Sequence, residues 1–256
     1  MALPETADAI EDEDSTLEAL IAHATASVRM AETYSSPFPH IFFRDFFPTE
    51  FYRGLVDNPP ADATFDALNH HQTRFAARLY DAHAEETDPD EDGRWRKVSA
   101  VLQSAELEAV IRDKLAEGLE IRRKGEGLDR ADDLGLFAKP VIYKDLDGYS
   151  ISPHPDTRKK VVTMQLYMPR DDRQKDMGTT LYQMSAKGVL HPGSYFLEPV
   201  KTFPFLPNVG YAFVVLKPSH SVLKTSWHGR PKINTTPGEP RVSVLNTFYA
   251  KDSYGF

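Results

Sequence analysis

A change of hydrophobic pattern near Lys139 limits the possible folds more than any other feature of the sequence. Beyond this point the chain consists of short runs of β-branched and aromatic residues, separated by proline and glycine. Such runs predict strands, and they cover residues 140–144, 160–168, 179–184, 193–197, 210–216 and 241–249. We therefore expect a β-structured second half that is supported by a mainly helical first half.

Three segments of the first half have helical periodicity. The first covers about 15–33, where Ser15 and Glu18 form a capping-box pattern before an apolar helix face. The second follows Pro48, and the third starts near Ser104. Helices in these places would pack their apolar faces against the β-structure.

Five polar residues of the second half indicate a metal site with an anion pocket beside it: His154, Asp156, His228, Arg241 and Ser243. Two imidazoles and one carboxylate are the ligands that hold Fe(II) on one face and leave the opposite positions open. His154 and Asp156 are two residues apart, so on an extended chain both side chains leave the same face. Arg241 and Ser243 share a face in the same way, and a guanidinium with a hydroxyl can bind a carboxylate.

The third ligand has two rivals. His220 follows Pro218 and Ser219 in a predicted turn, and His191 precedes another Pro-Gly turn. His228 lies in a Ser-Trp-His-Gly segment shortly before Arg241, and we prefer it for that reason. A His-x-Asp pair alone is more often a hydrogen-bonded surface pair. The presence of His228, Arg241 and Ser243 favours a metal site instead.

These residues carry a family resemblance. Segments 149–156, 226–229 and 241–243 resemble the motifs of iron- and 2-oxoglutarate-dependent oxygenases. Segments 37–43 and 46–52 resemble the strand and helix that often open the prolyl-hydroxylase-like branch of these enzymes. The chain departs from the pattern in two places, because segment 148–154 is slightly longer and 177–181 lacks a paired glycine.

The resemblance implies a fold and a division of the chain. The expected fold is mainly β with N-terminal helices, and its core is a double-stranded β-helix, the jelly-roll of cupin-like proteins. We expect residues 1–14 to form an acidic, flexible N-terminus and 15–256 to form one oxygenase domain. Within it, 15–138 is mainly helical support and substrate region, and 139–250 is the β-helix core.

The resemblance also implies cofactors and a reaction. His154, Asp156 and His228 would bind Fe(II), and 2-oxoglutarate and O₂ would be cosubstrates. Arg241 and Ser243 would hold the distal carboxylate of 2-oxoglutarate. Tyr167 and Tyr143 lie on strands where relatives place pocket tyrosines, although an aromatic residue in a barrel more often packs than binds. The implied activity is that of a dioxygenase that hydroxylates an unactivated C–H bond, with succinate and CO₂ as coproducts.

The sequence indicates the substrate only as a broad chemical class. A net charge of −8 and a pI near 5.6 exclude a general basic field, so nucleic acid is not expected. A small metabolite or biosynthetic intermediate is preferred, and a protein side chain such as proline is the alternative. Loops choose substrates in such folds, which points to segments 69–80 and 170–177. Arg74 and Arg78 could hold an anionic substrate group or form surface ion pairs, and we prefer the ion pairs.

Other classes stay open beside the oxygenase: a cupin-like metalloenzyme that does not use 2-oxoglutarate, and a non-catalytic binding barrel. Without cysteine there are no thiolate metal sites.

No leader or membrane span is recognised, so we expect a soluble, cytoplasmic protein whose oligomeric state is unknown. The run 88–93 begins like a calcium loop but lacks its closing carboxylate, so a solvated turn is expected. The basic run 158–160 is also expected to be a solvated loop.

Overall fold

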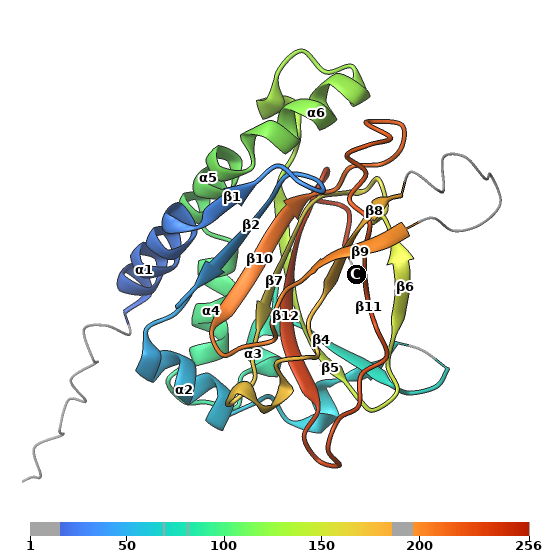
Figure 1. Cartoon of the computed structure of the whole chain (residues 1–256). Coiled ribbons are helices and arrows are strands. Elements are labelled where there is room, and N and C mark those ends of the chain that lie inside the picture. Colours follow the sequence, from blue (N-terminus) through green and yellow to red (C-terminus); the bar gives the residue numbers. More distant parts are fainter. Residues whose placement is uncertain (1–15, 69, 81, 186–196, 256) are drawn as a thin grey trace, which may run out of the picture.

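The computed structural model describes residues 16–68, 70–80, 82–185 and 197–255. These residues form two antiparallel sheets with helices on one side (Figure 1). The predicted tail 1–14, most of the predicted strand 193–197 and the rival ligand His191 lie outside the described residues.

The larger sheet has the strand order β1-β2-β10-β7-β12-β5-β4-β3 among the described residues. Its strands are β1 (Glu32–Tyr34), β2 (His40–Arg44), β3 (Asp66–Ala67), β4 (Arg74–Arg78), β5 (Phe137–Asp145), β7 (Lys160–Tyr167), β10 (Val209–Val214) and β12 (Arg241–Tyr249). The smaller sheet has the order β6-β11-β8-β9. Its strands are β6 (Ile151–His154), β8 (Thr180–Met184), β9 (Leu197–Thr202) and β11 (His228–Arg230).

The course of the chain between the sheets is that of a double-stranded β-helix. From β5 onward the strands alternate between the larger and the smaller sheet, and the hairpin β8–β9 stays in the smaller one. The central strands β5, β12, β7 and β10 of the larger sheet thus face β6, β11, β8 and β9. The predicted fold class, a mainly β double-stranded β-helix with N-terminal helices, is confirmed. Its topology brings together strands that are far apart in the sequence.

Helices cover the side of the larger sheet that faces away from the smaller one (Figure 1). They are α1 (Leu17–Met30), α2 (Thr49–Asp57), α3 (His83–Thr87), α4 (Arg94–Leu102), α5 (Ala105–Lys114) and α6 (Ala116–Glu126). Short 3₁₀ turns are η2 (Asp62–Thr64), η3 (Ala131–Asp133) and η4 (Asp172–Gln174). Leu20 of α1 and Ile111 of α5 join one hydrophobic core with Val244 and Phe248 of β12.

The three predicted helices are present as α1, α2 and α5. The side chain of Thr16 caps α1, accepting a hydrogen bond from the Ala19 amide, and Ser104 caps α5. The predicted cap at Ser15 lies outside the described residues. Helix α6 was missed, since Gly118 interrupts its pattern. A Cβ at Gly118 would lie 2.7 Å from Val214, so the glycine allows the helix to approach β10.

The acidic run 88–93 is a turn, as expected, but its charges are paired. Arg94 contacts the carboxylates of Asp90 and Asp92, and the Arg96 amide donates to Asp88. Gly93 has φ +66°, a left-handed conformation that starts α4. This segment therefore acts as the N-terminal boundary of α4.

Strand alternation gives the larger sheet two different faces. On β7, Val162, Met164 and Leu166 point to the helices, while Thr163 and Gln165 point to the smaller sheet. The inward positions of neighbouring strands include charged residues that are fully buried. Buried charges are rare without partners, so this inner face is where a functional site is expected.

Candidate functional site

The smaller sheet brings two predicted ligands together. His154 ends β6 and His228 begins β11, and the two residues are direct cross-strand partners. Asp156 follows two residues after His154, at the edge of this sheet, where β6 has only β11 as a neighbour among the described strands. The ligand atoms of His154, Asp156 and His228 lie within 4.8 Å of one another. The chain therefore assembles the predicted His-Asp-His group.

Backbone carbonyls fix which nitrogen of each imidazole is available. Nδ1 of His154 donates to the carbonyl of Ser152 at 2.9 Å, and Nδ1 of His228 donates to that of Ser226 at 3.0 Å. A carbonyl can only accept, so each Nδ1 carries the proton and each Nε2 presents a lone pair. Such carbonyl contacts are the usual support of metal-binding histidines.

Two acceptors face each other inside this group. Nε2 of His228 lies 3.7 Å from Oδ2 of Asp156, and both residues are buried. Burial lowers the pKa of His228 to about 4, so the ring is neutral near pH 7. A lone pair and a carboxylate oxygen at this distance attract a cation between them. The donor set, the two tautomers and this contact all fit a divalent metal ion.

Asp156 is held from both sides. Its Oδ1 accepts from Nζ of Lys160 at 2.8 Å, and its Oδ2 accepts from Oγ1 of Thr163 at 2.7 Å. Burial alone would raise the pKa of Asp156, but the Lys160 ammonium and these hydrogen bonds hold it well below its ordinary value. The carboxylate is therefore ionised and fixed in position. Lys160 was predicted to be part of a solvated loop, which is wrong, because it orients this carboxylate.

The rival histidine His220 lies apart from this group. Its Nδ1 accepts from the Lys217 amide at 3.1 Å, and its Nε2 is 3.5 Å from Glu126 of α6. His220 therefore stabilises the turn after β10 and brings this turn into contact with α6. Trp227 is half-buried beside β8 of the smaller sheet, and its carbonyl accepts from the Tyr182 amide.

A second cluster lies on the inner face, where β5, β11 and β12 contribute charges. Nη1 of Arg230 donates to Oδ2 of Asp145 at 2.6 Å, and Nη1 of Arg241 donates to the same oxygen at 3.0 Å. The side chains of Arg241 and Asp145 are fully buried, and that of Arg230 is 5% exposed. Two buried guanidinium groups thus share one carboxylate.

This cluster keeps unused hydrogen-bond donors. Nη2 of Arg241 and Nε of Arg230 are buried without a hydrogen-bond partner among the described residues. Burial and the neighbouring Arg230 cation lower the pKa of Arg241 to about 10, so Arg241 stays charged at neutral pH. Buried donors without acceptors are costly, and an anionic ligand would satisfy them. The arginine pair therefore fits an anion such as a carboxylate.

The other residues predicted for the cosubstrate lie beside this pair. Ser243 has Tyr143 and Tyr167 as its direct cross-strand partners, so the three form a row across β5, β12 and β7. The Ser243 hydroxyl accepts from Arg241 at 3.2 Å and from Gln165 at 2.9 Å. The Tyr167 hydroxyl accepts from the Thr179 amide at 2.9 Å. The sequence thus indicated residues that the fold places next to one another.

Sequence reasoning missed two members of the cluster and misread a third. Arg230 and Asp145 were not considered, although Arg230 is two residues from His228 and must share its side of β11. Arg74 was expected in a surface ion pair, which is wrong. Its Nε is 3.3 Å from Oδ1 of Asp145, and its guanidinium lies 4.1 Å from the centre of the Tyr143 ring.

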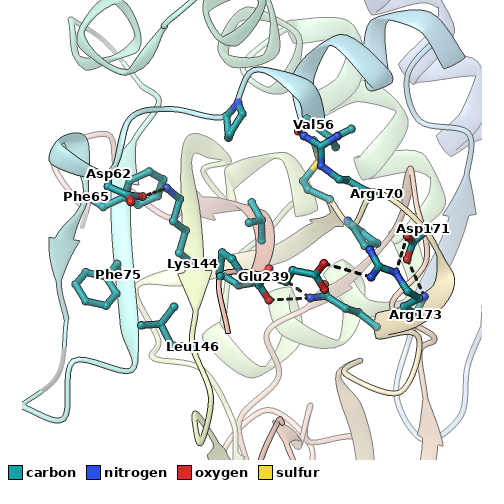
Figure 2. A pocket seen from close by; sticks show the side chains of 17 residues that line it. Val56, Asp62, Phe65, Phe75, Lys144, Leu146, Arg170, Asp171, Arg173 and Glu239 are labelled. Carbon is teal, nitrogen blue, oxygen red and sulfur yellow. Dashed lines mark hydrogen bonds and ion pairs between the residues drawn. The ribbon is translucent and has the colours of Figure 1, made fainter. Parts of the chain in front are cut away.

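The two segments expected to choose the substrate meet at one pocket of about 670 Å³. Phe75, Lys144 and Arg173 line it (Figure 2). Val242 also belongs to its lining. Lys144 and Val242 alternate with the inward-facing Asp145 and Arg241 along their strands. The pocket therefore lies on the opposite side of the larger sheet from the His-Asp-His group. A role of these segments in substrate choice stays a prediction.

No protein-family model matches the sequence, and no curated protein sequence matches it. Among solved structures, the chain is similar to a prolyl-4-hydroxylase of Pseudomonas putida, with 14% identity, coverage of 90% of this chain and 98% of the other, and a TM-score of 0.45. A 2-oxoglutarate–Fe(II) oxygenase-family protein of Burkholderia pseudomallei has 10% identity, 91% coverage of both chains and a TM-score of 0.45. The α-ketoglutarate-dependent epimerase SnoN of nogalamycin biosynthesis has 12% identity, coverage of 91% and 84%, and a TM-score of 0.49.

Among the described residues, no helix is both long and apolar enough to cross a bilayer.

Proposed function

We propose that this protein is an Fe(II)- and 2-oxoglutarate-dependent dioxygenase that hydroxylates an unactivated C–H bond. One juxtaposition carries the proposal. A His-Asp-His group, with Asp156 and His228 buried, and a buried arginine pair with unused donors occur together between the sheets of a double-stranded β-helix. Either feature alone would also suit a protein of another class, but a metal-chelating keto acid with a distal carboxylate needs both.

His154, Asp156 and His228 would hold the metal. With 2-oxoglutarate and O₂, Fe(II) at this position would supply the oxidation, in which substrate C–H becomes C–OH and 2-oxoglutarate becomes succinate and CO₂. The protein residues would do the positioning. Lys160 and Thr163 hold the Asp156 carboxylate, and backbone carbonyls hold the two rings.

Arg241 and Ser243 would hold the far end of the keto acid. The unpartnered Nη2 of Arg241 offers the donor, and the Ser243 hydroxyl is already oriented toward the same guanidinium. Tyr167 lines this position from the neighbouring strand, and the Arg241 guanidinium lies 5.2 Å from its ring centre. Tyr143 is less directly placed, because its ring packs against Arg74.

A small metabolite or biosynthetic intermediate remains our preferred substrate, in a cytoplasmic setting. The acidic chain supports this choice over nucleic acid. The solved structures similar to this chain include an epimerase bound to nogalamycin RO and a prolyl hydroxylase bound to a peptide fragment. Hydroxylation of a protein side chain is the alternative substrate class.

The test is an anaerobic titration of the metal-free protein with Fe(II), followed by 2-oxoglutarate. We expect iron binding and then a weak visible charge-transfer band, which reports chelation of the metal by the keto acid. His154→Ala should lose iron binding and the band, and Arg241→Met should keep iron binding but need much more 2-oxoglutarate. Iron binding without any band at saturating 2-oxoglutarate would reject the cosubstrate, and no iron binding would reject the metal site.

One observation favours a second candidate, a metalloenzyme that does not use 2-oxoglutarate. Asp145 already accepts hydrogen bonds from both arginines, which would be enough for a structural role of Arg241. In that case Arg241→Met would reduce stability, and the metal site would bind ligands without a distal carboxylate. The same titration separates the two candidates.

A further inference from the structure

Arg230 belongs to the buried arginine pair, but the function proposed so far gives it no contact of its own with the cosubstrate. Arg230 lies on β11 two residues after His228, so both side chains leave the same side of the strand. Its Nη1 donates to Asp145 at 2.6 Å, and its Nη2 donates to Thr179 at 3.1 Å. Arg230 thus connects the strand that begins with His228 to the cluster of Asp145 and Arg241.

The charges around Asp145 do not balance. Arg230 and Arg241 bring two positive charges to one carboxylate, and all three side chains are at least nine-tenths buried. Arg74 approaches the other oxygen of Asp145 from the more exposed side at 3.3 Å. Buried charges persist when they are paired. The cluster therefore has room for at least one further negative charge.

The unused donors belong to the same two arginines. Nη2 of Arg241 and Nε of Arg230 both lack partners among the described residues, while Nη1 of each points to Oδ2 of Asp145. Asp145 thus fixes one corner of each guanidinium and leaves other donors open. A carboxylate bound by both arginines would satisfy donors that Asp145 cannot reach.

We propose that Arg230 is a second cation of the cosubstrate pocket, and that Asp145 is the counterion that positions both arginines. The inference rests on the proposed function and adds a specificity-determining residue to it. The distal carboxylate of 2-oxoglutarate is bound between Arg230 and Arg241. Loss of either arginine lowers the affinity for a ligand that has the distal carboxylate.

Charge explains what Arg230 adds. Without Arg230, Asp145 and Arg241 neutralise each other, and the remaining cation is Arg74, whose side chain is 16% exposed. With Arg230, the cluster also keeps a buried positive charge after Asp145 is counted. A ligand that only chelates the metal, such as oxalate, does not depend on this charge.

The experiment measures binding of 2-oxoglutarate and of oxalate to the anaerobic Fe(II)-loaded protein by calorimetry. Arg230→Met should weaken 2-oxoglutarate binding by about 10- to 100-fold, the usual effect of losing hydrogen bonds to a charged group, and leave oxalate binding within about twofold. Arg230→Lys, which keeps the charge without the planar fork, should recover part of the loss. Arg130→Met is the matched control, because Arg130 is exposed and pairs with Asp132 outside this cluster.

Two results would overturn the inference. The first is unchanged 2-oxoglutarate affinity in Arg230→Met together with a large loss in Arg241→Met, which would leave the proposed function intact. The second is an equal loss of oxalate and 2-oxoglutarate binding in Arg230→Met and in Arg230→Lys, which would show a structural role. If Arg241→Met also kept full 2-oxoglutarate affinity, the proposed function itself would fail.

Discussion

Replacing Asp145 by asparagine should destabilise the protein strongly while keeping the shape of the side chain. Asp145 is fully buried and accepts from Arg230 at 2.6 Å and from Arg241 at 3.0 Å. Removing one member of a buried ion pair typically costs about 3–5 kcal/mol, because the partner charges stay buried without compensation. For a chain of this size, this corresponds to a fall in Tm of roughly 6–20 °C.

The assay is urea denaturation of wild type and Asp145→Asn at constant ionic strength, with and without 2-oxoglutarate. Asp57→Asn is the control, since Asp57 and Arg170 are both 59% exposed and such a pair contributes about 0–1 kcal/mol. The anion should stabilise Asp145→Asn more than wild type, because it replaces the missing negative charge. A loss below about 1 kcal/mol in Asp145→Asn would refute the reasoning, as would a variant that the anion does not stabilise.

Three further outcomes are expected. Asp156→Ala should abolish iron binding and turnover with an unchanged far-ultraviolet spectrum, and retained metal stoichiometry would contradict the site. Burial lowers the pKa of His40 to about 4, so on acidification the imidazole is protonated in the unfolded chain before it is protonated in the folded one. The free energy of unfolding should therefore fall as the pH drops from about 6.5 to 4, by roughly 3 kcal/mol in total. His40→Gln should flatten this part of the curve of stability against pH. Asn208→Ala should cost about 2–4 kcal/mol in urea denaturation, because two hydrogen bonds to the backbone of Phe47 are lost and the residue has φ +56°. An Asn208→Ala midpoint equal to wild type would count against that assignment.

The sequence allowed the β-helix core to be predicted wherever its strands are long. Segments 160–168 and 241–249 differ from β7 and β12 by at most one residue, because strands of this length have enough alternating positions to show their period. Strand β11 covers only His228–Arg230 and β6 only Ile151–His154. Such short strands have no readable period, although they hold both candidate imidazoles, and only the motif around each histidine indicated them.

The candidate site was predictable to the extent that its residues lie close in sequence. His154 with Asp156, and Arg241 with Ser243, are local pairs whose spacing defines a shared face. The pairing of Asp145 with Arg230 and Arg241 joins residues 85 and 96 positions apart, and it depends on sheet order that a single sequence does not contain. Arg74 was misread for the same reason, since β4 joins the sheet beside β5.

The direct pairing of His154 with His228 across β6 and β11 makes a bound metal a reporter of folding. A slip of one residue between these strands would turn one imidazole to the outside and break up the ligand group. An ion at this site would therefore select the correct register, and at 100 times its Kd it would stabilise that register by about 2.7 kcal/mol. Metal uptake during refolding would then mark the moment at which β6 and β11 pair in the smaller sheet.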